Sequence, residues 1–96
     1  MSPLNKKKLS KIRIQLDKLD NSLINIIKKR TNLVKKVLEL KDKKKQIIDQ
    51  KRINIILKKI KKKSVKNKID PKITNRIWKN MIWSYINYER KIFKKK

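Results

Sequence analysis

The sequence predicts an all-α protein made of three helices, the first of them very long. Gly is absent from the 96 residues, so the tight hairpin turns that need a positive φ are disfavoured. Pro3 and Pro71 are the two strong helix breakers, and between them apolar residues recur every three or four positions. We expect residues 1–96 to form one domain whose basic ends, about 1–8 and 94–96, are frayed.

The first helix is expected to run from about Leu4 to Lys44. At about 1.5 Å per residue it would be about 60 Å long, whereas a compact chain of this size is about 30 Å across. The rest of the chain cannot cover such a helix, so we expect a second copy to lie along it in a homodimer. The helix carries a heptad-like apolar stripe at Leu9, Ile12, Leu16, Leu19, Leu23, Ile26, Leu33, Val37 and Leu40.

Two shorter helices are expected after a polar loop at Asp42–Gln46. Asp49 is a suitable N-cap for a second helix, and the aperiodic run 61–68 that follows this helix is expected to be a solvated connection. Asp70 and Pro71 then provide an N-cap and a first-turn proline for the third helix. The expected apolar faces are Ile53, Ile56, Leu57 and Ile60 on the second helix, and Ile73, Ile77, Trp78, Met81, Ile82, Tyr85, Tyr88 and Ile92 on the third.

The composition excludes several kinds of chemistry. Without Cys and His the chain has no disulfide, no thiolate nucleophile and neither of the commonest zinc ligands. There is no apolar run long enough to span a bilayer and no signal peptide, which favours a cytoplasmic protein. The net charge of +25 comes mostly from Lys and accompanies a lack of Ala and Gly. It is open to two interpretations: a nucleic-acid footprint, or the codon drift typical of an AT-rich genome.

Charged residues interrupt the apolar stripes at a few places. Arg30 occupies a heptad core position, where a guanidinium is unfavourable unless it is paired or faces a ligand. Lys41, eleven residues on, lies within about 20° of the same helix face. Arg13 points elsewhere and could enter a partner's pocket; Arg52 lies in the first turn of the second helix, and Glu89 on the apolar face of the third. Such a set suits a small molecule with two carboxylates, because Arg binds a planar carboxylate bidentately.

A purely structural interpretation of the same residues stays open. A core Arg often pairs with an acid such as Asp20 or Glu39, or extends its charged end to water. Aromatic residues such as Trp83 and Tyr85 more often pack than touch a ligand.

The spacing of the charged residues resembles that of the all-helical chorismate mutase family. The family pattern is an Arg, an Asp seven residues on, an Arg ten further and a Lys eleven further. Asp49-Gln50-Lys51-Arg52 is similar to its Asp-x-x-Arg element, and Ile69-Asp70-Pro71 resembles the start of its third helix. The pattern matches without a gap at Arg13, Asp20, Arg30 and Lys41.

The resemblance implies an intertwined homodimer and a reaction, chorismate to prephenate, in phenylalanine and tyrosine biosynthesis. This rearrangement is pericyclic, so the resemblance also implies no metal and no cofactor. It implies that Arg30 and the partner's Arg13 hold the substrate carboxylates while Arg52 adds positive charge. Lys41 and the residue at position 89 would donate to the ether oxygen whose bond breaks. We therefore take Lys41, Glu89 and Arg30 as catalytic candidates. The candidate substrate-binding set is Arg13, Arg30, Lys41, Asp49, Arg52, Ile53, Tyr85 and Glu89.

Two positions depart from the mutase pattern. Ile53 stands where mutases usually carry a Glu that holds the ring hydroxyl, and Glu89 stands where many have Gln. A carboxylate cannot donate a hydrogen bond, so Glu89 would need to be protonated; burial would raise its pKa and Lys41 would lower it.

An alternative reaction fits an apolar residue at position 53. The related isochorismate-pyruvate lyases of salicylate synthesis look similar there, and the run 81–86 and the interval from Lys41 to Arg52 resemble theirs. A third possibility, a basic helical protein that binds nucleic acid, explains the charge but not Arg30 and Glu89 on apolar faces.

Overall fold

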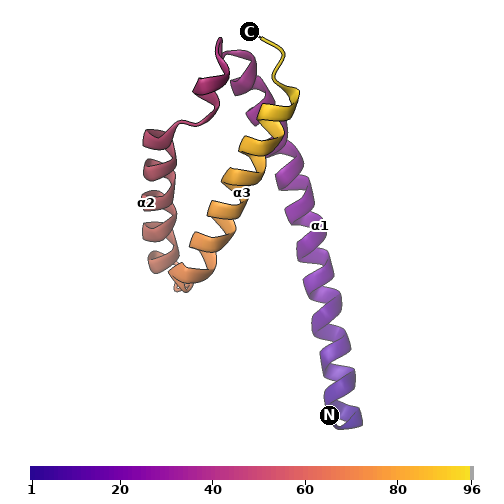
Figure 1. The fold of residues 1–96 in the computed structure, drawn as a ribbon. Helices are drawn as coiled ribbons and strands as arrows, with labels where there is room; N and C mark the ends of the chain where they lie inside the picture. Colours follow the sequence, from indigo (N-terminus) through magenta and orange to yellow (C-terminus); the bar gives the residue numbers. More distant parts are fainter. Residues whose placement is uncertain (96) are drawn as a thin grey trace. The chain divides into compact units, whose positions relative to one another are not determined.

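The computed structural model describes residues 1–95, and these are all-α as the sequence predicts. The elements are α1 (Pro3–Glu39), a short 3₁₀ helix η1 (Lys44–Ile47), α2 (Gln50–Lys66) and α3 (Pro71–Ile92), with no strand among the described residues (Figure 1). The chain divides into two units, Met1–Leu33 and the part that begins at Val34. None of the described helices is long and apolar enough to cross a membrane.

The first unit is a single helical segment, the N-terminal part of α1. The helix begins at Pro3, so the expectation that residues 3–8 are frayed is corrected. Ser2 explains the early start: its Oγ accepts from the Asn5 N–H at 3.1 Å and its carbonyl from the Lys6 N–H at 2.9 Å. Ser at the N-cap followed by Pro at the first helical position is a favourable helix start. At the C-terminal end of the chain, where fraying was also expected, Lys94 and Lys95 follow α3 outside any helix, and residue 96 lies outside the described part.

The apolar stripe of the first unit is exposed. Six of its side chains are each more than half accessible to solvent in the single chain: Ile12, Leu16, Leu19, Leu23, Ile26 and Leu33. Single exposed apolar residues are normal on a protein surface, but a periodic row of this length is not.

The second unit starts with the last turns of α1 and a compact turn. α1 ends at Glu39, five residues before the expected end, and the predicted loop at Asp42–Gln46 is wrong in part because η1 occupies Lys44–Ile47. Gln46 stabilises this turn, since its Oε1 accepts from the Asp42 N–H at 2.8 Å and the Lys43 N–H at 2.9 Å.

α2 begins as expected but extends further. The Asp49 Oδ1 accepts from the Arg52 N–H at 3.0 Å, which confirms the predicted N-cap. The prediction that 61–68 is a solvated connection is wrong up to Lys66, because α2 continues. Ser64 is only 3% exposed, and its Oγ lies 2.6 Å from the Ile60 carbonyl oxygen and 2.6 Å from the Thr74 Oγ1 of α3. Lys68 then reverses the chain in the left-handed region at φ 58°, where proteins usually place Gly.

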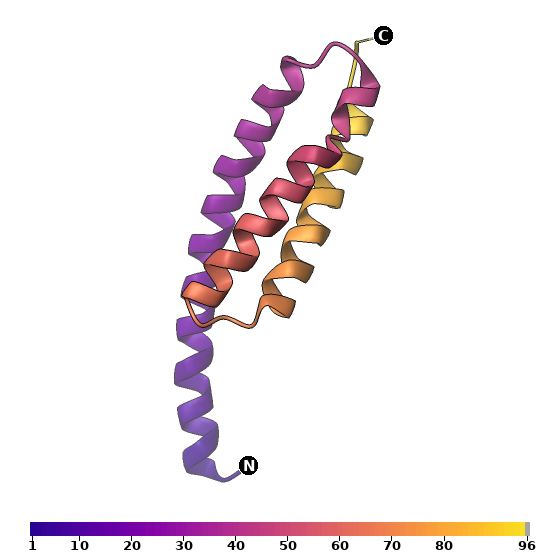
Figure 2. The same cartoon turned by 90° about the vertical axis from the view of Figure 1, so that its left-hand side faces the viewer.

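α3 starts as predicted, with Asp70 accepting from the Lys72 N–H and Pro71 in the first turn. Figures 1 and 2 both show α2 and α3 lying side by side. Of the predicted apolar face of α3, Ile82 is buried, whereas Ile73 and Ile77 are exposed in the single chain. The buried apolar side chains of the second unit are Leu38, Ile47, Ile53, Ile82 and Ile86.

Candidate functional site

Lys41 lies two residues after the end of α1, in the turn that leads to η1. Its backbone N–H donates to the Leu38 carbonyl at 3.1 Å, and its half-buried side chain crosses the turn to donate from Nζ to the Ile47 carbonyl at 3.5 Å. Ile47 is 3% exposed and belongs to the core. The lysine is therefore held at both its backbone and its ammonium group.

Glu89 lies on α3 and is buried, with 6% of its surface exposed. Burial raises the pKa of the Glu89 carboxyl above its ordinary value, and the positive charge of Lys41 opposes that shift. The expectation that these two influences act on Glu89 in opposite directions is confirmed. Of the two, burial is the larger, so the protonated carboxyl is favoured relative to an exposed glutamate.

The remaining candidates of the second unit lie on α2 and α3. The Arg52 side chain is exposed in the first turn of α2, and Asp49 uses its carboxylate to cap that turn. Ile53 is 8% exposed and packs in the core with Ile82 and Ile86, so it has a structural role whatever it does for a substrate. Tyr85 is half-buried on α3, one helical turn before Glu89.

Arg13 and Arg30 belong to the first unit, on α1. Arg13 is exposed, whereas Arg30 is half-buried. Within the described residues, the Arg30 Nε atom is buried and has no hydrogen-bond partner. A buried, unsatisfied guanidinium N–H is unfavourable on its own and is the kind of group that an anion satisfies.

Two polar residues that the sequence did not single out hold the second unit together. One is Gln46, which closes the turn after Lys41, and the other is Ser64, which joins α2 to α3. The signal for Gln46 was the spacing of a capping box, a cap residue followed three positions later by Gln, but the cap residue here is Lys43 rather than Ser or Thr.

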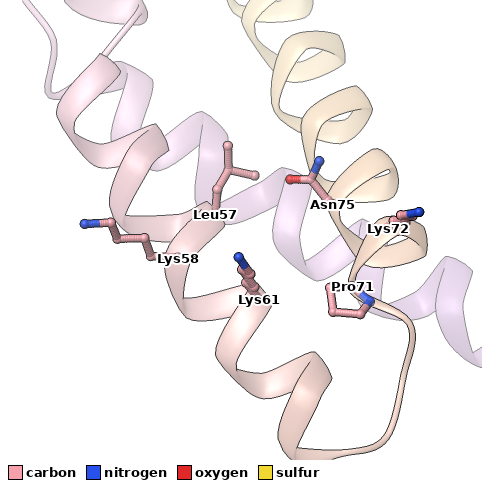
Figure 3. A pocket seen from close by; sticks show the side chains of 6 residues that line it. All are labelled: Leu57, Lys58, Lys61, Pro71, Lys72 and Asn75. Carbon is pink, nitrogen blue, oxygen red and sulfur yellow. The ribbon is translucent and has the colours of Figure 1, made fainter.

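A hollow of about 380 Å³ lies between α2 and α3, away from these groups. Figure 3 shows the Lys58 and Lys72 side chains pointing to opposite sides, so their ammonium groups do not converge on one ligand. None of the candidate site residues contributes to it: its lining is Leu57, Lys58, Lys61, Pro71, Lys72 and Asn75.

The second unit thus brings together an ammonium group and a buried carboxyl with a raised pKa. The Lys41 ammonium donates hydrogen bonds, and the Glu89 carboxyl donates one when it is protonated. Such a pair can stabilise negative charge that develops on an oxygen atom without forming a covalent bond to it.

Comparison with known proteins shows a similarity at the level of the family. The family model of chorismate mutase type II matches residues 12–90. No curated protein and no solved structure matches the chain. The matched range includes every candidate site residue, from Arg13 to Glu89.

Proposed function

Because the chain belongs to the chorismate mutase type II family, we propose that it is a chorismate mutase that rearranges chorismate to prephenate. The observation that carries this proposal is the electrostatic interaction of Lys41 with the Glu89 carboxyl, whose burial raises its pKa. We place the reaction in aromatic amino acid biosynthesis and the protein in the cytoplasm.

The reaction needs neither a nucleophile nor a cofactor. In one concerted step the ether C–O bond breaks and a new C–C bond forms within the same molecule, and no proton is gained or lost. The enzyme therefore has two tasks: to hold the flexible dianion folded, and to stabilise the charge that builds on the ether oxygen. A chain without Cys and His can perform both.

We assign the second task to Lys41 and Glu89. The Lys41 ammonium donates to the ether oxygen, and the protonated Glu89 carboxyl donates to the same atom. The pKa of Glu89 is raised by burial, so the donor form is present at lower pH and is lost as the pH rises through that raised pKa.

We assign the first task to arginines. Arg30 and the Arg13 side chain of a second copy bind the two substrate carboxylates, and Arg52 adds positive charge at the start of α2. The unpartnered Nε of Arg30 supports its role as an anion ligand. The exposed apolar row of the first unit supports a homodimer, because a second copy would bury it.

Isochorismate-pyruvate lyase is the second candidate. In that reaction a ring hydrogen passes to the enolpyruvyl carbon as pyruvate leaves, and salicylate remains. Ile53 favours this candidate, because an apolar side chain cannot hold the hydroxyl of chorismate. The burial of Ile53 in the core offers an equally direct reason for its presence, so we place the mutase first.

The proposal is tested by replacing Lys41 with Met. The loss of a donor to a developing negative charge costs about 10²- to 10³-fold in turnover. We expect chorismate turnover of Lys41→Met to fall by at least that factor, with unchanged helicity in far-ultraviolet circular dichroism. Lys45→Met is the matched control, because Lys45 is an exposed lysine of the same turn, and it should keep full turnover. An active Lys41→Met enzyme would contradict the assignment.

A further inference from the structure

The turn between α1 and α2 controls where the Lys41 ammonium lies. Lys41 lies outside any helix, between the end of α1 and the start of η1, so no helical hydrogen-bond ladder fixes its own position. Its side chain reaches across the turn to the Ile47 carbonyl, so the position of its ammonium group depends on the shape of residues 41–47. A Lys side chain that is not held by a contact samples many rotamers, so its ammonium group has no fixed position.

One side chain closes this turn. The Oε1 atom of Gln46 accepts two backbone hydrogen bonds, 2.8 Å from the Asp42 N and 2.9 Å from the Lys43 N, the two residues directly after Lys41. The backbone of the same residue donates to the Lys43 carbonyl at 3.0 Å. Gln46 therefore ties the start of the turn, at Asp42 and Lys43, to its end. The next residue is Ile47, whose carbonyl accepts from the Lys41 ammonium.

The far end of the turn is anchored to the helix that carries Glu89. Ile47, next to Gln46, is buried in the core with Ile82 and Ile86, and η1 packs against α3. Two other lysines near this end of α3 are engaged elsewhere: the Lys35 Nζ lies 5.9 Å from the centre of the Tyr88 ring, and the Lys95 Nζ donates to the Glu39 carbonyl. Lys41 is the charged side chain whose field acts on the Glu89 carboxyl.

We propose that Gln46 is a positioning residue for catalysis: by closing the 41–47 turn with its amide oxygen, it holds the Lys41 ammonium beside Glu89. Gln46 does not touch the substrate and acts only through Lys41. The expected effect of Gln46 on turnover rests on the proposed function. Its expected effect on the Lys41–Glu89 interaction rests only on the geometry of the turn.

The first test is kinetic. Gln46→Met keeps the length of the side chain but removes the acceptor, and we expect kcat for chorismate to fall about tenfold with little change in KM, because Lys41 acts in the transition state. Gln46→Glu keeps an acceptor oxygen and should stay within about twofold of the native enzyme. Gln50→Met is the matched control: it removes another hydrogen-bonded Gln, whose Nε2 donates to the Asn54 Oδ1 at 3.0 Å on α2, and should have no effect. Full activity of Gln46→Met, or equal losses in Gln46→Met and Gln46→Glu, would overturn the proposal.

The second test does not depend on turnover. Glu39 and Glu89 are the only glutamates, so protein labelled with ¹³C at the glutamate carboxyl gives two titrating signals, assigned with Glu39→Gln. Lys41 lowers the pKa of Glu89, so Lys41→Met should raise that pKa further, and Gln46→Met should raise it in the same direction. In a Lys41→Met background, Gln46→Met should change nothing more.

The two tests separate the proposals. A native protein that is inactive on chorismate would refute the proposed function, whereas the titration would still decide the role of Gln46. An unchanged pKa of Glu89 in Gln46→Met, or a shift that persists without the Lys41 ammonium, would overturn the positioning role.

Discussion

Ser64→Ala tests how α2 and α3 are joined. The Ser64 hydroxyl is almost fully buried and lies 2.6 Å from both the Ile60 carbonyl oxygen and the Thr74 Oγ1. Each net hydrogen bond contributes about 0.5–1.5 kcal/mol to the free energy of unfolding, so the loss of both should cost about 1–3 kcal/mol. Thr74 would keep one contact, at 3.3 Å, to the Pro71 carbonyl.

A matched variant removes the effect of helix propensity. Ser84 is exposed on α3, so Ser84→Ala makes the same chemical change without burial and should stay within about 0.5 kcal/mol of the native protein. Both variants gain the same helix propensity, and their difference isolates the contribution of the buried Ser64 hydroxyl.

The assay is urea unfolding followed by circular dichroism at one fixed protein concentration, because dimerisation would make stability depend on concentration. In thermal melts each kcal/mol corresponds to about 4–8 °C for a chain of this size. Thr74→Val should cost less in the Ser64→Ala background than in the native protein, because the two hydroxyls share a bond. Equal stability of Ser64→Ala and Ser84→Ala would refute the account of this contact.

Three further predictions concern the site, the dimer and the core. Glu89→Gln should abolish the loss of turnover as the pH rises through the raised pKa of Glu89, because an amide donates at every pH; an unchanged pH–rate profile would exclude the protonated donor. Arg13→Ala and Arg30→Ala chains, each inactive alone, should regain about one working site per heterodimer when mixed, and no recovery in the chorismate assay would count against a site shared between chains. Ile86→Ala should lower the free energy of unfolding by about 2–5 kcal/mol, because Ile86 is 4% exposed; a loss under about 1 kcal/mol in urea would place this residue outside the core.

The helix starts were predictable from the sequence because they depend on local chemistry. Asp49 and Asp70 each accept a backbone N–H of the first helical turn, and Pro71 fits the first turn of α3. The long first helix was also predictable, although Ser2 begins it earlier than expected. Such caps involve residues within three positions of one another, so the sequence alone contains the information.

The end of α2 was not predictable from periodicity. Positions 53, 57, 60 and 64 continue one buried or half-buried face, but the last is Ser64, and a polar residue interrupts the apolar pattern. Its hydroxyl bonds to the Ile60 carbonyl of the same helix and to Thr74, ten residues away on α3, and the second contact depends on tertiary structure. The role of Gln46 was not predictable either, because the residue at the cap position of η1 is Lys43 and not Ser, Thr, Asp or Asn.

The candidate site was predictable in part. The burial of Glu89 and its electrostatic interaction with Lys41 follow from the apolar face of α3 and from the family spacing, and the structure agrees with both. The core position of Ile53 was not foreseen as a reason for its departure from the mutase pattern. The roles of Arg13 and Arg30 stay predictions, because they involve a second chain and a bound substrate.

The most direct test of the central claim is turnover by the purified protein with two substrates in parallel. The native sequence is the right protein for it, because Ile53→Glu would place a charge in the core and confuse specificity with unfolding. One sample receives chorismate, whose ultraviolet absorbance falls as prephenate forms, and the other receives isochorismate, whose conversion to salicylate is followed by fluorescence. We predict loss of chorismate with formation of prephenate and little salicylate. Salicylate without prephenate would make the protein a lyase, and no reaction in either sample would contradict both assignments.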